Sequence, residues 1–388
     1  MTNPWRGRGH SVRFILGALL CTLLAWYGTS HPFGNWDLVG YTATAYSYQG
    51  PDPAAVHEKT WASLGRAMPP DILERLRSGS DYKQTVAISP EALGQQIPFY
   101  KPRVLFTALT GLVHATTGIE IPLAAVAVSA ICTGLLMIVL YTFLSRRFNP
   151  VASLVLVALL SAFFKFGLFA RAGSPDTLAS VLGLLTVLAF CQRRYPAFLA
   201  CSVLLILARH ETLVLVTLLC LSGGFGWRKS LLAAALALLS FAGLYLFSHW
   251  YGWGVLFMHT FVAPFPYPAQ AVTPGPVLWA AYLQQWSVLL NDLVTEFGNP
   301  LPIGALVALA VLWRRPDLVD SRVCLALALS MLVKLALFPA VEGHWFRLYL
   351  IEILSVLLLI LDGACRWRSP AFRAPGERPH DPAQNSGA

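Results

Sequence analysis

The stretch IPLAAVAVSAICTGLLMIVLYTFL, residues Ile121–Leu144, decides the fold class of this chain. It carries no Asp, Glu, Lys or Arg, and about 20 apolar helical residues match the ~30 Å hydrocarbon core of a bilayer. Such runs predict an all-α, polytopic membrane helix bundle of about ten or eleven transmembrane helices. The other runs are Phe14–Tyr27 with its flanks, Val151–Phe169, Leu178–Cys191, Leu199–Leu207, Leu213–Leu221, Leu231–Phe247, Leu301–Trp313, Val323–Phe338 and Leu348–Leu361.

The composition of the 388-residue chain agrees with this class. Hydrophobic residues make up 56% of the chain and charged residues only 12%, which is about half of the charged share in soluble domains. The net charge of +9 comes from small basic clusters between apolar runs, as in short cytoplasmic loops, and does not indicate nucleic-acid binding. The seven cysteines lie in or at the ends of apolar runs and indicate neither a disulfide framework nor a metal site.

The basic clusters also predict the orientation, because Lys and Arg near membrane helices favour the cytoplasmic side. They place both termini in the cytoplasm, with loops 31–102 and 250–300 outside. One bundle then spans 1–365, and a disordered tail follows at 366–388. The N-terminal apolar run is expected to be a retained signal-anchor, with a cleaved signal peptide as the alternative. The clusters are Arg6 with Arg8 and Arg13, Arg146 with Arg147, Arg193 with Arg194, Arg228 with Lys229, Arg314 with Arg315, and Arg366 with Arg368.

If the segment Arg103–Gly118 crosses the membrane, Arg146 and Arg147 lie outside, which contradicts the preference of basic residues for the cytoplasmic side. Its roughly 15 residues would reach only ~22 Å as a helix, short of the ~30 Å core. Polar residues recur on one face of that helix and apolar residues on the other. We therefore expect an interfacial helix on the outer surface, with a short true crossing as the alternative. Loop 31–102 carries helix signals of its own and is expected to form a helical cap.

Asp37 stands directly after the first apolar run, in the sequence Gly34-Asn35-Trp36-Asp37-Leu38-Val39-Gly40-Tyr41. A carboxylate at the outer surface can act as a general base on an acceptor hydroxyl, or as a metal ligand. The neighbouring rings of Trp36 and Tyr41 offer apolar faces with a polar edge, which suit a sugar. The alternative is that Asp37 caps a short helix among the aromatic residues of an interfacial belt.

Other predicted outer turns also hold charged residues. Asp176 begins an apolar run after Ser-Pro, which favours a helix start, and with Arg171 close by the turn also suits an anion. Arg209 and Glu211 interrupt apolar sequence and are expected to face a bundle interior or a wet cavity, unless they form a plain outer turn. Arg347 begins the last apolar run and suits a phosphate group, unless it only flanks a helix.

Five further polar residues need an interpretation. Arg103 begins the interfacial segment, and His344 precedes Arg347 in the last outer loop. An ordinary interfacial position is the alternative for His344, and it is the expectation for His259. Lys334 can pair with Glu352, because both are placed deep in apolar runs where a lone charge is costly. The alternative is that their side chains reach out to the membrane interface.

This layout resembles the GT-C superfamily of integral-membrane glycosyltransferases, which includes protein mannosyltransferases, oligosaccharyltransferase catalytic subunits and aminoarabinose transferases. The resemblance covers residues 14–362 as an arrangement. It rests on Asp37 after the first helix, on the segment Arg103–Gly118, on the turn from Arg171 to Asp176, and on Arg347-Leu348-Tyr349. It implies catalysis by Asp37 and a sugar donor carried on a polyprenyl phosphate. The chain departs from the family in that Asp37 has no acidic neighbour. No soluble outer domain follows the last helix, so that a large peptide acceptor is not implied.

The sequence therefore predicts an inverting glycosyltransferase of the cytoplasmic membrane. Asp37 would take the proton of the acceptor hydroxyl, and Asp176 would be a supporting acid, or a ligand if a divalent metal takes part. Arg347, with Arg171 or Arg209, would hold the leaving phosphate. The expected partners are the lipid-linked donor and membrane lipid, without nucleic acid. The substrate-binding candidates are Arg347, Arg171, Arg209, Trp36, Tyr41, Arg103, Glu211 and His344.

Two other functions remain open at this point. One is a transporter or flippase of a lipid-linked or anionic solute, which would use the same arginines but need no base at Asp37. The other is an inactive membrane protein with a transferase-like fold. The sequence shows no internal repeat, which weakens the transporter interpretation.

Overall fold

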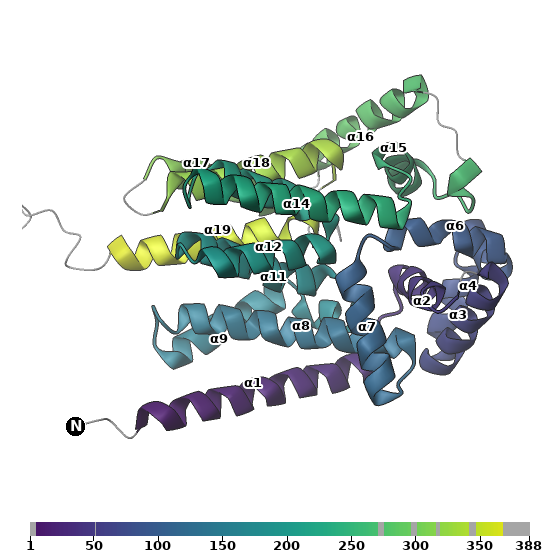
Figure 1. The fold of residues 1–388 in the computed structure, drawn as a ribbon, viewed down its shortest axis with the longest axis horizontal. Helices are drawn as coiled ribbons and strands as arrows, with labels where there is room; N and C mark the ends of the chain where they lie inside the picture. The colour runs from purple at the N-terminus through teal and green to yellow at the C-terminus, as the bar shows by residue number, and fades with distance from the viewer. Residues whose placement is uncertain are drawn as a thin grey trace, which may run out of the picture.

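The computed structural model describes residues 5–50, 52–270, 275–295, 301–315, 319–340 and 347–367. Regular structure within these residues is helical throughout, which confirms the all-α prediction. Long helices run side by side along one axis, and shorter helices gather at one end of this bundle (Figure 1). We call the group of short helices α2–α6 the cap, and the end of the bundle that it covers the cap end.

The helices of the bundle run between the cap end and the opposite end (Figure 1). Their bounds are α1 (Trp5–Ser30), α8 (Ile121–Leu144), α9 (Pro150–Phe163), α10 (Phe166–Ala172), α11 (Asp176–Cys191), α12 (Tyr195–Ala208), α13 (Leu213–Leu221), α14 (Trp227–Ser248), α16 (Gly275–Thr295), α17 (Leu301–Trp313), α18 (Ser321–Leu337) and α19 (Leu350–Trp367).

Two described helices, α8 and α14, are long and apolar enough to cross a membrane. The pair α9 and α10 passes the same criterion together and is bent by 61° where Lys165 adopts a left-handed backbone conformation, with φ at 54°. The described part of the chain therefore has two, or up to three, helices that can span a bilayer. The predicted total of ten or eleven crossings stays a prediction.

The segment predicted as a helical cap is helical. Side-chain oxygens of Asp52, Ser80 and Ser89 accept hydrogen bonds from the first turns of α3, α5 and α6, which fixes where these short helices begin. Glu120 joins the cap to the bundle, because its carboxylate accepts hydrogen bonds from Ser63 and Arg66 of α3, each at 2.6 Å. The cap consists of α2 (Asp37–Ser47), α3 (Pro53–Ala67), α4 (Pro70–Ser78), α5 (Asp81–Ile88) and α6 (Pro90–Tyr100).

The segment predicted to be interfacial forms α7 (Val104–Thr117), which runs across the bundle axis beside the cap (Figure 1). Thr107 and Thr110 of its polar face are buried in the protein, whereas Leu112 of its apolar face is 58% exposed. This orientation suits a helix whose outer side meets lipid. A position at the membrane interface stays a prediction.

The end of the bundle opposite the cap holds basic residues from distant loops. Arg147, after α8, pairs with Asp362 of α19, and Arg193, after α11, pairs with Asp320 at 3.0 Å. The bundle thus gathers two of the basic clusters at one end. Helix α19 continues to Trp367, past the predicted start of the tail, and residues 368–388 lie outside the described residues.

The segment predicted as an outer loop over 250–300 is largely helical where it is described. It contains α15 (Trp253–Phe257), a π-helical turn at Met258–Val262 and the long helix α16. The prolines of this segment lie mostly between Ala263 and Gly275, so they leave α15 and most of α16 uninterrupted.

Candidate functional site

A cavity of about 510 Å³ lies at the cap end, where α2, α11 and α19 begin and α12 ends. This volume is in the range of small-ligand sites. Its lining combines charged residues with leucine, valine and aromatic side chains. The charged and polar lining consists of Asp37, Arg103, Asp176, Arg209, His210, Glu211, His259, Thr260, Lys334 and Arg347.

Asp37 is held at the first position of α2. The Asn35 side-chain oxygen accepts a hydrogen bond from the backbone nitrogen of Leu38 at 3.1 Å, which caps the helix start beside Asp37. The neighbouring Trp36 is fixed by a 3.0 Å hydrogen bond from its indole nitrogen to the hydroxyl of Tyr82 in the cap. A carboxylate at a helix start is stabilised by the exposed backbone N–H groups. Asp37 therefore has a fixed place, with 29% of its side chain exposed.

Asp176 begins α11, and the turn before it explains how it reaches Asp37. Gly173 has a φ of 61°, and a Cβ atom there would lie 2.7 Å from Leu38 Cδ1. Only glycine permits both this conformation and so close an approach. The hydroxyl of Ser129 donates to the backbone oxygen of Ser174 at 2.8 Å and holds the turn on α8. The predicted juxtaposition of Asp37 and Asp176 in one cavity is confirmed.

The charged residues form a continuous chain of opposite charges. Arg347 Nη1 lies 3.1 Å from Asp37 Oδ2 and 3.7 Å from Asp176 Oδ2. Arg209 pairs through Nη1 with the other oxygen of Asp176, and through Nε and Nη2 with Glu211 Oε1, both at 2.6 Å. The order is Asp37, Arg347, Asp176, Arg209, Glu211. Each arginine bridges two carboxylates, which holds both guanidinium groups beside the cavity.

The two aspartates have different surroundings and so suit different tasks. Asp176 is 4% exposed and has three partners, since Ser174 also donates to it at 2.8 Å. Asp37 is more exposed, and within the described part of the chain Arg347 is its one hydrogen-bond or ion-pair partner. The carboxylate of Asp37 therefore retains an oxygen that can accept a proton from a ligand in the cavity, whereas Asp176 holds the arginines in place.

Arg347 is positioned by buried contacts of the residues that follow it in the chain. Lys334 of α18 donates to the backbone oxygen of Leu348 at 2.9 Å and pairs with Glu352 of α19 at 2.7 Å. The predicted pairing of Lys334 and Glu352 is thus confirmed. The hydroxyl of Tyr349 donates to backbone oxygens at the end of α18. These contacts attach the start of α19 to α18 directly beside Arg347.

The remaining predicted residues divide between the cavity and other places. Trp36, Tyr41 and Arg103 line the cavity. Arg171 is not in its lining. Its guanidinium instead donates to the backbone oxygen of His31 and lies over the ring of Tyr27.

Of the two arginines predicted as alternatives beside Arg347, the cavity is therefore lined by Arg209 and not by Arg171, because α10 turns its last residues toward α1. His344 lies outside the described residues, so its predicted role stays untested. Among the described residues, no group of three or more His, Cys, Asp or Glu side chains is arranged to hold a metal ion.

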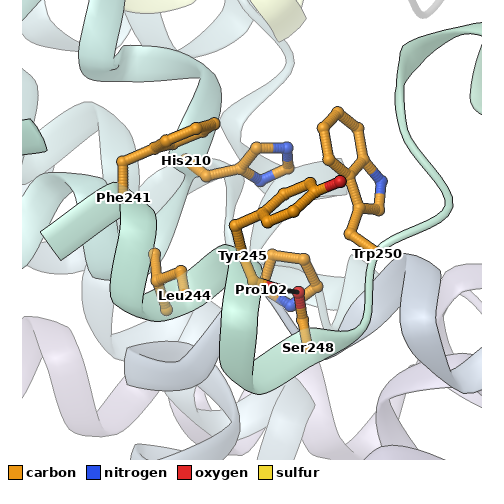
Figure 2. Close-up of a pocket in the computed structure, with 7 residues that line it drawn as sticks. All are labelled: Pro102, His210, Phe241, Leu244, Tyr245, Ser248 and Trp250. Carbon is orange, nitrogen blue, oxygen red and sulfur yellow. Dashed lines mark hydrogen bonds between the residues drawn. The ribbon is translucent and has the colours of Figure 1, made fainter. Parts of the chain in front are cut away.

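Several lining residues were not predicted from the sequence. His259 lies in the cavity wall, with its ring 4.9 Å from that of Phe99, whereas the sequence suggested an interfacial position. His210 and Trp250 line the same cavity and also a small adjoining pocket (Figure 2). The position of His210 between Arg209 and Glu211 was the one signal that could have identified it.

Comparisons with protein-family models, with curated proteins and with solved structures found no match for this chain. The chemistry of the cavity therefore carries the functional argument. Its charged wall can bind an anion through arginine and can accept a proton on Asp37, and its apolar wall can hold hydrocarbon or the face of a sugar ring.

Proposed function

We propose that this chain is an integral-membrane glycosyltransferase with a GT-C-like bundle of ten or eleven crossings. It moves a sugar from a polyprenyl-phosphate donor to an acceptor hydroxyl on the outer face of the cytoplasmic membrane, with inversion at the anomeric carbon. Both termini are cytoplasmic, and the cap faces outward. The proposal combines two lines of support, the resemblance of the sequence to that superfamily and the arrangement of charges in the cavity.

One observation carries the proposal. Asp37 and Arg347 are 310 residues apart in the chain, yet they meet at 3.1 Å in the wall of one 510 Å³ cavity. Sugar transfer from a phosphate-linked donor requires two groups. One is a carboxylate that can take a proton, and the other is a cation that can hold a phosphate. The mixed polar and apolar lining also suits a ligand that joins a charged headgroup to a hydrocarbon chain.

The proposed reaction is a single displacement. The acceptor oxygen attacks the anomeric carbon and gives its proton to Asp37, while the bond from that carbon to the phosphate oxygen breaks with its electron pair going to the phosphate. Arg347 and Arg209 stabilise the charge that develops on this leaving group in a site shielded from water. Asp176 keeps both guanidinium groups aimed at the cavity.

The order of contacts implies a role for the donor itself. Arg347 pairs with Asp37 in the structure, so a phosphate that takes this arginine also frees the carboxylate of Asp37. The carboxylate of Asp37 then becomes a stronger base when the donor is bound, because it has lost its cationic partner.

The test uses the full chain reconstituted in liposomes with a panel of short-chain prenyl-phosphate sugars. The proposed enzyme releases prenyl phosphate from a donor of this panel, with a simple alcohol or water as the minimal acceptor. A transporter would instead move the intact donor between leaflets without cleaving it. Movement without cleavage would replace the proposed function by the transport alternative, and neither event for any donor would favour an inactive protein.

A further inference from the structure

The wall formed by His210, Glu211 and Trp250 carries polar atoms that the proposed reaction does not use. Glu211 Oε1 receives both hydrogen bonds from Arg209, at 2.6 Å each. The other oxygen, Oε2, is buried and has no hydrogen-bond partner among the described residues. The same holds for Nδ1 of His210, which lies 3.5 Å from that oxygen. Buried polar atoms without partners are uncommon and require an explanation, which a bound group that reaches both atoms would supply.

The two atoms match the hydrogen-bonding capacity of a hydroxyl group. A hydroxyl can donate to the carboxylate oxygen and accept from an imidazole N–H at the same time. A phosphate oxygen cannot donate in this way, and the negative carboxylate repels it. The site of Glu211 Oε2 and His210 Nδ1 therefore differs in kind from the phosphate-binding face at Arg347.

Aromatic rings hold His210 in this position. The His210 ring lies between Phe241 and Trp250, with ring centroids 6.3 Å and 5.1 Å away (Figure 2). The pocket behind it has only about 10 Å³, and His210 is 7% exposed. Burial lowers the pKa of His210 to about 4, so the ring is neutral near pH 7 and has one N–H donor. The rings also offer apolar faces against which the C–H groups of a sugar can pack.

The charges of the cavity decide between kinds of sugar. Three carboxylates line it, Asp37, Asp176 and Glu211, and they are matched by the three arginines at 103, 209 and 347. Lys334 also lines the cavity, and its charge is matched by Glu352, which is not part of the lining. The lining thus has no surplus negative charge that would favour a cationic amino sugar, and Glu211 Oε2 disfavours an acidic one.

We propose that Glu211 and His210, with the rings of Phe241 and Trp250, form the subsite that binds a hydroxyl of a neutral sugar on the donor. This subsite rests on the proposed function, since it names the sugar class that the transferase uses. Glu211 and His210 bind one hydroxyl between them, and the aromatic rings pack against the sugar ring.

The test compares the binding of three probes to the full chain in lipid nanodiscs by titration calorimetry. The probes are prenyl phosphate without sugar, the prenyl-phosphate ester of a neutral hexose and that of an amino hexose. We expect the wild type to bind the neutral hexose ester about ten- to hundred-fold more tightly than prenyl phosphate, as for hydrogen bonds to a charged group. Glu211→Gln and His210→Phe should lose most of this preference. His210→Phe should keep its affinity for prenyl phosphate, whereas Glu211→Gln also removes the negative partner of Arg209, so the preference of each variant is measured against its own affinity for prenyl phosphate.

The exposed Glu91→Gln in the cap is the matched control and should retain the full preference. His210→Phe keeps an aromatic ring between the same neighbours but removes the ring nitrogen. It therefore tests the hydrogen bond to the sugar even if Glu211→Gln fails to fold. A panel of donors that each lack one sugar hydroxyl identifies the hydroxyl bound by Glu211. Relative to prenyl phosphate, the wild type and Glu211→Gln should bind the donor without that hydroxyl equally well.

The remaining outcomes separate this subsite from the transferase itself. Equal binding of prenyl phosphate and the neutral hexose ester by the wild type overturns the subsite, while donor cleavage in liposomes still supports the transferase. Preference for the amino hexose overturns the neutral-sugar assignment alone. Failure to bind any of the three probes overturns the subsite and the transferase together.

Discussion

Arg347→Lys is the substitution that best separates a phosphate-binding arginine from a charge that merely flanks a helix. The guanidinium contacts Asp37 at 3.1 Å and Asp176 at 3.7 Å through one nitrogen, which leaves its other N–H groups for a ligand. In particular, Nε is buried and lacks a hydrogen-bond partner among the described residues. A lysine ammonium keeps the charge but cannot hold two carboxylates and grip a phosphate with parallel hydrogen bonds.

The expected loss follows from the hydrogen bonds that disappear. One charge-assisted hydrogen bond contributes about 1.5–3 kcal/mol, which corresponds to about a 10- to 150-fold decrease in kcat/KM for the donor. The assay is release of prenyl phosphate by the full chain in liposomes at several donor concentrations. Arg171→Lys is the matched control, because Arg171 lies outside the cavity and should tolerate the change. Equal donor dependence of wild type and Arg347→Lys would refute the phosphate-binding assignment.

Three other substitutions test the structure around the site, each by thermal unfolding in detergent. Gly173→Ala should destabilise the protein by about 1–3 kcal/mol, because its Cβ meets Leu38 and its φ is positive, whereas Gly111→Ala in α7 has open space around it and should not. Lys334→Met should lower the free energy of unfolding by about 3–5 kcal/mol, because it leaves the buried Glu352 without its cation. Adding Glu352→Gln should recover much of that loss, and simple additivity of the two single effects would contradict the buried pair. The lowered pKa of His210 means that the unfolded chain binds the extra proton between pH 6.5 and about 4, so stability should fall as the pH falls through this window. His210→Asn should flatten that dependence, and an unchanged pH profile would show that the imidazole is not buried in its neutral form.

The all-helical class and the cap were predictable because they depend on local sequence. Apolar runs such as Ile121–Leu144 give helices regardless of their neighbours, and Asp52 or Ser89 before a proline marks a helix start. The meeting of Asp37 with Asp176 was also inferred, from the expectation that both lie at outer helix ends. These predictions succeeded because they rest on patterns that can be recognised along the chain, namely apolar runs, helix-start residues and basic clusters.

The finer composition of the site depends on packing between distant segments. Arg171 precedes Asp176 closely in sequence, yet α10 directs it to the backbone of His31 and away from the cavity. Trp250 reaches His210 only because α14 ends beside the turn after α12, and no local pattern encodes that contact. The helix α16 was missed because the prolines around it indicated a loop, although they lie mostly before its start.

The most direct measurement of the central claim is single-turnover sugar transfer by Asp37→Asn, set beside its donor binding. If Asp37 is the general base, the variant should lose transfer by about 10²- to 10⁴-fold. Its donor affinity should be retained or increased, because Arg347 no longer pairs with a carboxylate at 3.1 Å. Transfer at the wild-type rate by a folded Asp37→Asn protein would contradict the account.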